Sequence, residues 1–224
     1  MLNDTLNSDA PSYEAIRHAM VASQLRTNAV NDARVVAAMG RVPRELFLPE
    51  DARRYAYLDS ARPLSEGRGL NPPIATGRLL TEVGVRPQDR VLLIGAATGY
   101  TAAVLSELSE SVVAVEDNAA LVATARVALT GYPSVMLVEA PLVAGAPDRA
   151  PFDLLVIDGA VEQVPDTLIQ QLKPGGRIAA GLVDRGVTRL ATGTRTAGGF
   201  GLIDFADVEC VILPGFERPR SFTF

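Results

Sequence analysis

The chain has 224 residues, of which 48% are hydrophobic, and this is enough for one large α/β domain with an N-terminal extension. Its formal net charge of −5 provides no basic surface for nucleic acid. The single cysteine, Cys210, excludes an internal disulfide, and the single histidine, His18, excludes a histidine-rich metal site. His18 falls in an N-terminal helical pattern, and the sequence offers no Ser-His-Asp triad. Any reaction must therefore run without a histidine base or a soft metal, and we expect no metal site.

No apolar run reaches the length of a membrane span. The first residues also lack the cationic start and apolar stretch of a signal peptide. We therefore expect a cytoplasmic protein whose partners include neither a membrane nor a nucleic acid, and whose oligomeric state is left open.

The N-terminal part of the chain predicts helices joined by irregular segments. Ser12 can cap a helix over residues 13–26, and a second short helix follows and is stopped by Gly40. Residues 59–73 are rich in proline and glycine and predict a loop with little regular structure. Proline at position 73 suits the first turn of a helix over residues 73–83, which glycine then ends.

From Arg90 onward, predicted strands and helices alternate, which indicates a parallel sheet with right-handed crossovers. The predicted strands are residues 91–95, 112–116, 135–138, 154–158 and 177–182, and the predicted helices are residues 100–108, 118–129 and 164–172. Asp117 can cap the second of these helices. We divide the chain into an N-terminal helical segment with a substrate loop (1–89) and a core (90–224), which together form one compact domain.

After the fifth predicted strand the helical pattern stops. Residues 187–192 and 207–213 predict a pair of strands at the end of the sheet, joined by a glycine-rich segment. Cys210 falls in the second of them. A buried structural thiol is the favoured interpretation over a nucleophile, because no histidine is nearby in the sequence.

The first strand of the alternating region ends in the most informative pattern. A dinucleotide fingerprint requires G-x-G-x-x-G, but only Gly95 fits, since Ala97 and Tyr100 occupy the other two positions, and we reject a nicotinamide or flavin cofactor. The remaining pattern ends at Gly99 and lets the backbone turn sharply and approach a ligand. Glu116 ends the next strand and can accept hydrogen bonds from both ribose hydroxyls of a nucleotide-like cofactor. Two alternatives are glycines that serve packing alone and a Glu116 that is merely a solvated charge.

Several segments along the chain occur in an order found in one enzyme family. They are residues 20–25, 32–35, 42–49, 56–59, 91–100, 150–153 and 169–177. Through them the chain resembles the protein-L-isoaspartate O-methyltransferase family over roughly residues 18–215. The resemblance implies a class I S-adenosylmethionine-dependent (Rossmann-like) α/β core, with a mostly parallel sheet, antiparallel C-terminal strands and an N-terminal helical extension. It also implies S-adenosyl-L-methionine as cofactor and isoaspartyl-containing proteins or peptides as substrates.

Departures from the family pattern cluster at the expected cofactor and substrate sites. The acid that stands two residues before the first glycine is Leu93 here, the middle glycine is Ala97, and the adenine-contacting Gly-Asp-Gly segment aligns with residues 140–142. In the substrate loop, Gly69 and Asn71 stand where the family has threonine and serine. Lost hydrogen bonds and added bulk predict a cofactor affinity weakened by about 3–5 kcal/mol. The cofactor would bind in a notch between the first two parallel strands. We expect these changes to weaken binding there but to leave the notch unfilled by side chains.

The candidate site residues form two groups. The catalytic candidates, in the substrate loop, are Arg68, which can clamp a carboxylate bidentately, and Asn71, which can donate a hydrogen bond to it. The alternatives are a solvated loop charge and a turn residue before Pro72. The cofactor-binding candidates are Gly95, Ala97, Gly99, Glu116, Glu139 and Asp158. Glu139 is next to the vacated adenine-reading position, and Asp158 ends the fourth strand, at the ligand edge of such sheets.

The implied chemistry asks little of side chains. A carboxylate, with a pKa of about 4, is already ionised at neutral pH, so no general base is needed, and orientation supplies most of the barrier reduction. The resemblance predicts methyl transfer to isoaspartyl carboxylates of damaged proteins, a repair reaction. One alternative is a catalytically degenerate paralogue that binds cofactor weakly or not at all and has a binding or assembly role. The other is a methyltransferase that has changed its substrate.

Overall fold

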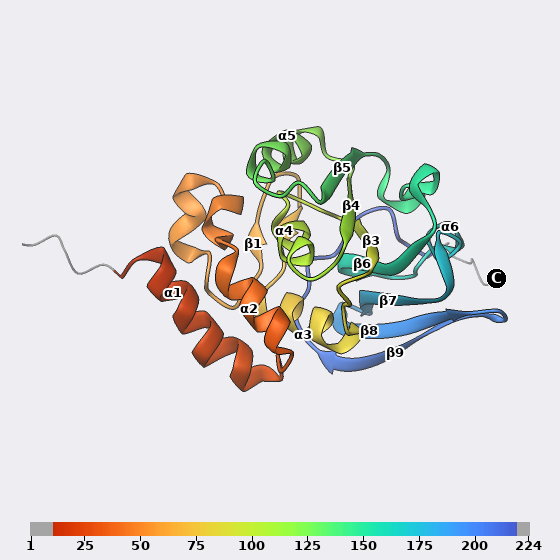
Figure 1. The fold of residues 1–224 in the computed structure, drawn as a ribbon, viewed down its shortest axis with the longest axis horizontal. Helices are drawn as coiled ribbons and strands as arrows, with labels where there is room; N and C mark the ends of the chain where they lie inside the picture. Colours follow the sequence, from red (N-terminus) through yellow and green to blue (C-terminus); the bar gives the residue numbers. More distant parts are fainter. Residues whose placement is uncertain (1–10, 219–224) are drawn as a thin grey trace, which may run out of the picture.

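The computed structural model describes residues 11–218. A seven-stranded sheet forms the centre of the molecule, with the strand order β5-β4-β3-β6-β7-β8-β9 (Figure 1). The strands are β3 (Arg90–Ile94), β4 (Ser111–Glu116), β5 (Val135–Glu139), β6 (Phe152–Val161), β7 (Leu172–Asp184), β8 (Val187–Thr196) and β9 (Gly199–Asp207). The first five are mutually parallel, and β8 and β9 complete the sheet in antiparallel pairing. The predicted mostly parallel sheet is therefore confirmed.

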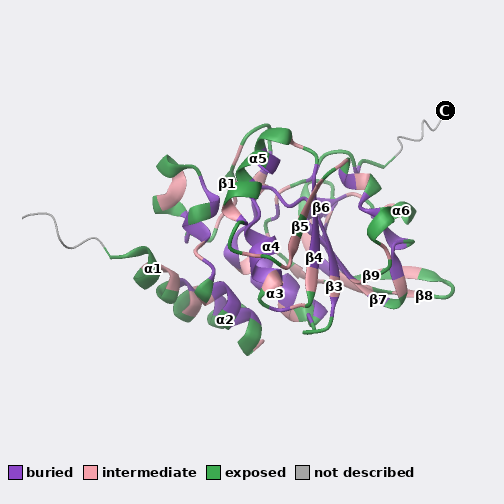
Figure 2. Cartoon of the chain, turned by 45° about the horizontal axis from the view of Figure 1, so that its top comes forward, coloured by how far each residue is buried: buried purple, intermediate pink, exposed green. Residues whose placement is uncertain are grey.

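Helices cover the sheet on both faces. They are α1 (Tyr13–Met20), α2 (Ala33–Arg41), α3 (Pro73–Val83), α4 (Tyr100–Ser106), α5 (Ala119–Ala128) and α6 (Asp166–Ile169). Odd-numbered positions of β3, such as Leu93, pack in one core with α3 and α4, and even-numbered positions pack with α6 and the C-terminal residues on the other face. Figure 2 shows α3 and α4 as largely buried, whereas the outer helix α1 is largely exposed.

The N-terminal helices follow the prediction with one change. Ser12 caps α1, because its hydroxyl accepts a hydrogen bond from the Ala15 amide at 3.2 Å. The expected continuous helix becomes a π-helical turn at Val21–Leu25 and a 3₁₀ turn at Arg26–Asn28. The next element, α3, begins at its proline and ends at Gly84 with a φ of 61°, as predicted.

A small hairpin lies between the N-terminal helices and α3. Its strands are β1 (Arg62–Pro63) and β2 (Gly69–Leu70), which pair antiparallel within the segment that was expected to have little regular structure. Short 3₁₀ helices at Arg44–Phe47 and Glu50–Tyr55 precede it. The hairpin thus gives a defined position to the predicted substrate loop.

Two predicted boundaries are wrong. Asn118, not Asp117, caps α5, because its side chain accepts hydrogen bonds from the backbone amides of Ala120 and Leu121. The predicted helix over residues 164–172 shortens to α6 because the chain enters β7 at Leu172. Among residues 11–218, no helix combines the length and the apolar character that crossing a membrane requires.

The predicted last strand is also wrong. The final strand, β9, is the glycine-rich segment itself, and residues 208–213 leave the sheet edge. They cross to the carboxyl end of β6, where Ile212 forms an isolated parallel bridge with Ala160. This segment places Leu213 in the core beneath the candidate site.

Cys210 is expected to be unreactive in the folded protein. The residue is 8% exposed, and burial, together with the negative charges of Asp158 and Glu209, raises the pKa of its thiol to about 12. Because the thiolate is the reactive form, we expect no labelling by Ellman's reagent at pH 8 in buffer and one equivalent in urea. Rapid stoichiometric labelling of the native protein would contradict this expectation.

Candidate active site

The candidate site lies at the carboxyl ends of β3, β4 and β6, where the strand order reverses direction and ligands of α/β sheets bind. Gly95 and Gly99 form the turn from β3 into α4 with φ values of 81° and 101°, which glycine adopts without strain. Ala97 has a φ of 49°, in the same left-handed region, so the residue that replaces the family's middle glycine keeps a glycine-like conformation. The turn thus holds Ala97 in a backbone conformation that glycine adopts more readily.

Glu116 is the electrostatic centre of this turn. Its carboxylate is fully buried and accepts backbone hydrogen bonds from Ala97 at 2.7 Å and from Asp117 and Asn118 at 3.1 Å. It is therefore no solvated charge at a strand end. Glu139, its register partner on β5, is exposed, and within residues 11–218 its side chain has no hydrogen-bond partner.

Arg68 reaches Glu116 from the β1–β2 hairpin. Its two terminal nitrogens donate to the two carboxylate oxygens at 2.5 and 2.8 Å, and one of them also donates to Asp117 at 3.1 Å. The side chain is 3% exposed, so the alternative of a solvated loop charge is wrong. Such a bidentate pair is strong. It leaves the arginine facing an internal acid rather than the open substrate side.

Asn71 and Asp158 form a second buried group beside the first. The side-chain amide nitrogen of Asn71 donates to Asp158 at 2.8 Å, and the side-chain oxygen of Asn71 accepts from the Val211 backbone amide at 2.8 Å. Asn71 is therefore more than a turn residue, because it joins the hairpin, β6 and the C-terminal segment. Burial raises the pKa of Asp158, although hydrogen bonds from Thr101 and Asn71 oppose the shift.

Asp158→Asn is expected to stabilise the protein at neutral pH. Below the ordinary carboxyl pKa of about 4, the acid is protonated in both the folded and unfolded states, and the substitution changes little. As the pH rises, ionisation favours the unfolded wild type, because its folded pKa is raised. The stability advantage of the variant should therefore grow from pH 4 upward until the folded pKa is passed. Urea unfolding of both proteins at pH 4 and pH 7 measures this difference in stability. A difference that shrinks as the pH rises would contradict the raised pKa of Asp158.

Leu213 fills the space between Gly95, which follows β3, and Gly159 of β6. A methyl group added to Gly95 would lie 2.9 Å from the Leu213 side chain, and one added to Gly159 would lie 2.6 Å from it. The backbone fixes this position, since the Leu213 amide donates to the Ala160 carbonyl at 2.9 Å. In this conformation, the side chains of Leu213 and Arg68 lie against Gly95, where a nucleoside would contact the turn.

The expectation of an unfilled notch is therefore wrong. Arg68 and Leu213 occupy it, not the substituted residues Leu93, Ala97 and Leu142, all of which are buried in the cores. The sequence carried no signal for Leu213, since its segment was predicted as an edge strand.

Sequence reasoning also missed Arg44. This fully buried arginine donates to the backbone carbonyls of Ala56 at 2.8 Å and of Asn71 at 2.6 Å. Its guanidinium lies 4.6 Å from the centre of the Tyr100 ring. Arg44 thus fixes the backbone of the substrate loop from below. The only available signal was an adjacent pair of charged residues, Arg44 and Glu45, inside an otherwise apolar connector.

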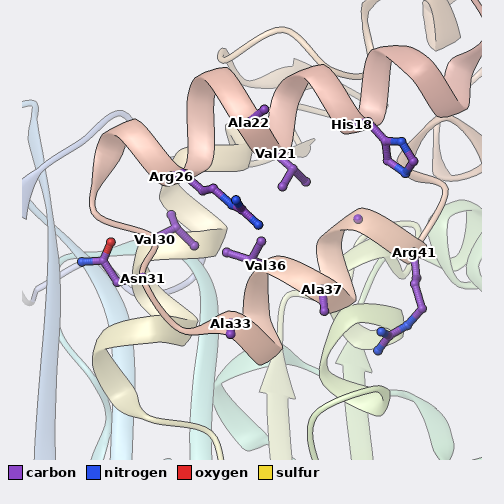
Figure 3. A pocket seen from close by; sticks show the side chains of 11 residues that line it. His18, Val21, Ala22, Arg26, Val30, Asn31, Ala33, Val36, Ala37 and Arg41 are labelled. Atoms are coloured by element: carbon purple, nitrogen blue, oxygen red, sulfur yellow. The ribbon is translucent and has the colours of Figure 1, made fainter.

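Two open cavities are found among the described residues, one away from this site and one that borders it through Ser65 and Thr98. One, of about 790 Å³, is enclosed by the α1–π-helix segment and α2, with His18, Arg26 and Arg41 around an apolar floor (Figure 3). The other, of about 960 Å³, lies between the 3₁₀ helix at Glu50–Tyr55 and α5. Neither is lined by the predicted cofactor residues.

A parallel sheet with a glycine turn after β3 and an acid at the end of β4 has the class I methyltransferase fold. A sequence profile described as protein-L-isoaspartate(D-aspartate) O-methyltransferase (PCMT) matches residues 16–202. The chain therefore belongs to that family.

Individual relatives agree with this assignment. Protein-L-isoaspartate O-methyltransferase 2 of Marinobacter nauticus is 36% identical over 95% of this chain and 99% of its own length. The protein-L-isoaspartate O-methyltransferase of Methanoculleus marisnigri is 38% identical over 73% of this chain and 76% of its own. A solved protein-L-isoaspartate O-methyltransferase superposes with a TM-score of 0.77 at 25% identity, covering 89% of this chain and 66% of that one. A putative Plasmodium falciparum enzyme, solved with S-adenosyl-L-homocysteine, shares the fold with a TM-score of 0.76 at 17% identity, over 88% and 97% of the two chains.

Proposed function

We propose that the protein transfers a methyl group from S-adenosyl-L-methionine to isoaspartyl carboxylates of damaged proteins. The observation that carries this proposal is the family match over residues 16–202. The site agrees with it, because the glycine turn and a buried acid meet at the carboxyl ends of β3 and β4. The comparisons give no support to the catalytically degenerate alternative.

Gly95, Ala97, Gly99 and Glu116 are the proposed cofactor-side residues, with Asp158 at the neighbouring strand. Asn71, held by Asp158 and by the Val211 amide, is proposed to position the substrate carboxylate. The substrate is ionised at neutral pH, which explains how a chain with one histidine and one buried cysteine can support the reaction. Arg68 cannot serve the substrate while it is paired with Glu116.

The domain arrangement and location are also proposals. Side chains from the helical segment before residue 90 and from the later core share one hydrophobic cluster, which supports a single folding unit. A lone, buried cysteine suits a reducing compartment such as the cytoplasm.

Methyl transfer to an isoaspartyl peptide tests the function directly. The purified protein is incubated with methyl-labelled S-adenosylmethionine and a peptide carrying isoaspartate, beside the same peptide carrying ordinary aspartate. Label only on the isoaspartyl peptide supports the proposal, whereas cofactor binding without labelling indicates a changed substrate. Binding itself is measured with S-adenosylhomocysteine, since ligand at a hundredfold excess over Kd should stabilise the fold by about 2.7 kcal/mol.

A further inference from the structure

All acceptor capacity of Glu116 is already used inside the protein. One oxygen accepts from Arg68 and from two backbone amides, and the other accepts from Arg68 and from the Ala97 amide. A carboxylate offers about four acceptor positions, and five donors are present. The acid therefore has none left for a ribose diol in this conformation.

The two segments that fill the notch are joined to each other. The hairpin that carries Arg68 meets the segment that carries Leu213 through the hydrogen bond from the Val211 amide to Asn71. A methyl group added to Gly69 of β2 would lie 3.2 Å from the Val211 side chain. Movement of either segment therefore disturbs the other, and the two can open together.

The turn of the β1–β2 hairpin is exposed and is held to the site by few side-chain contacts. Its turn residues Ser65, Glu66 and Gly67 are exposed, and Arg68 is the side chain that anchors this turn in the interior. An exposed hydrogen bond from Asn118 to Glu66 is its other tie to the rim of the site. Moreover, the buried Nε of Arg68 has no acceptor among the described residues, which is a cost that withdrawal of the side chain removes.

We propose that Arg68 and Leu213 form an internal plug that holds the cofactor site closed and that S-adenosylmethionine must displace. The inference rests on the proposed function, and it assigns a regulation to that site. When only a fraction of molecules is competent to bind, the apparent Kd rises by the inverse of that fraction. The plug thus sets cofactor affinity by its own stability.

Arg68→Gln tests the plug against a matched control in the same hairpin. Arg62 lies on β1 and donates to Ser60, away from Glu116, so Arg62→Gln changes the charge equally without touching the plug. Titration calorimetry with S-adenosylhomocysteine should show binding at least ~10-fold tighter for Arg68→Gln, because the open fraction rises. The control should stay within about twofold of wild type on the same scale.

Leu213→Ala provides a second variant that leaves the buried ion pair intact, should Arg68→Gln fail to fold. It should also tighten binding. In stopped-flow mixing, the observed rate for wild type should level off at high ligand, because opening limits it, and the plateau should be lost in the variants.

The outcomes separate the plug from the function. Wild type that binds as tightly as both folded variants, with no plateau, overturns the plug and leaves the enzyme. Weaker binding by Arg68→Gln shows that the arginine serves the cofactor and also overturns the plug. Absence of binding in wild type and in both folded variants overturns the proposed function, and the plug with it.

Discussion

Glu116→Ala is expected to lower the free energy of unfolding by about 3–5 kcal/mol, as removal of one partner from a buried ion pair does. The substitution leaves the buried Arg68 guanidinium with only the more exposed Asp117 as an acid partner, and three backbone amides lose their acceptor. Urea unfolding monitored by circular dichroism measures the loss. A decrease below about 1 kcal/mol would place Glu116 at an ordinary exposed position.

Glu139 provides the matched control, because it stands opposite Glu116 in the register of β4 and β5 but is exposed. Glu139→Ala should change the stability by no more than about 0.5 kcal/mol. The double variant Glu116→Leu, Arg68→Met should recover most of the loss, since an apolar pair of similar volume needs no desolvation of charge. A double variant as unstable as Glu116→Ala would show that the backbone amides, and not the arginine, make the acid necessary.

Local sequence signals predicted the turns, the helix starts and the alternation of strands and helices, because these features depend on neighbouring residues. The turn after β3 needs positive φ, and glycine at positions 95 and 99 announced it. Serine at position 12 and proline at position 73 marked helix starts for the same kind of reason. The alternation of apolar strands and helices then specified a parallel sheet, and with it the edge where Glu116 lies.

The contents of the site depended on contacts between distant residues. Arg68 stands in a glycine-rich loop, where arginine is usually solvated, and its burial follows from an acid 48 positions later in the chain. Residues 208–213 have the composition of a strand. Val208 and Cys210 still contact Thr188 of β8, but the partner of residues 211–213 is the carboxyl end of β6 and not the sheet edge. No periodicity in the sequence distinguishes these two destinations.

The departures from the family pattern take a different meaning in the structure. Leu93 is fully buried in a core shared with α3 and α4, so its effect on a cofactor is inseparable from packing. Ala97 keeps both the left-handed turn and an amide aimed at Glu116. We therefore attribute the expected loss of cofactor affinity to Arg68 and Leu213 instead of Leu93 and Ala97. Neither Arg68 nor Leu213 was singled out among the departures from the family pattern.

Arg44→Ala is expected to cost about 3–5 kcal/mol of stability, comparable to other large truncations in a packed core. Its loss leaves the Ala56 and Asn71 carbonyls without a described donor and opens a cavity beside the Tyr100 ring. Each buried acceptor left unpaired costs about 1–3 kcal/mol. Urea unfolding measures the total, and limited proteolysis of residues 59–72 reports whether the substrate loop loosens.

Arg54 supplies the control for Arg44, because both guanidinium groups lie over a tyrosine ring at similar distances, 4.7 Å and 4.6 Å, and Arg54 is exposed. Arg54→Ala should cost no more than about 1 kcal/mol. Equal losses for the two variants would mean that the cation–π contact alone stabilises Arg44. A larger loss for Arg44→Ala, with faster cleavage at 59–72, would mean that the buried hydrogen bonds to the loop carbonyls hold Asn71 in place against Asp158.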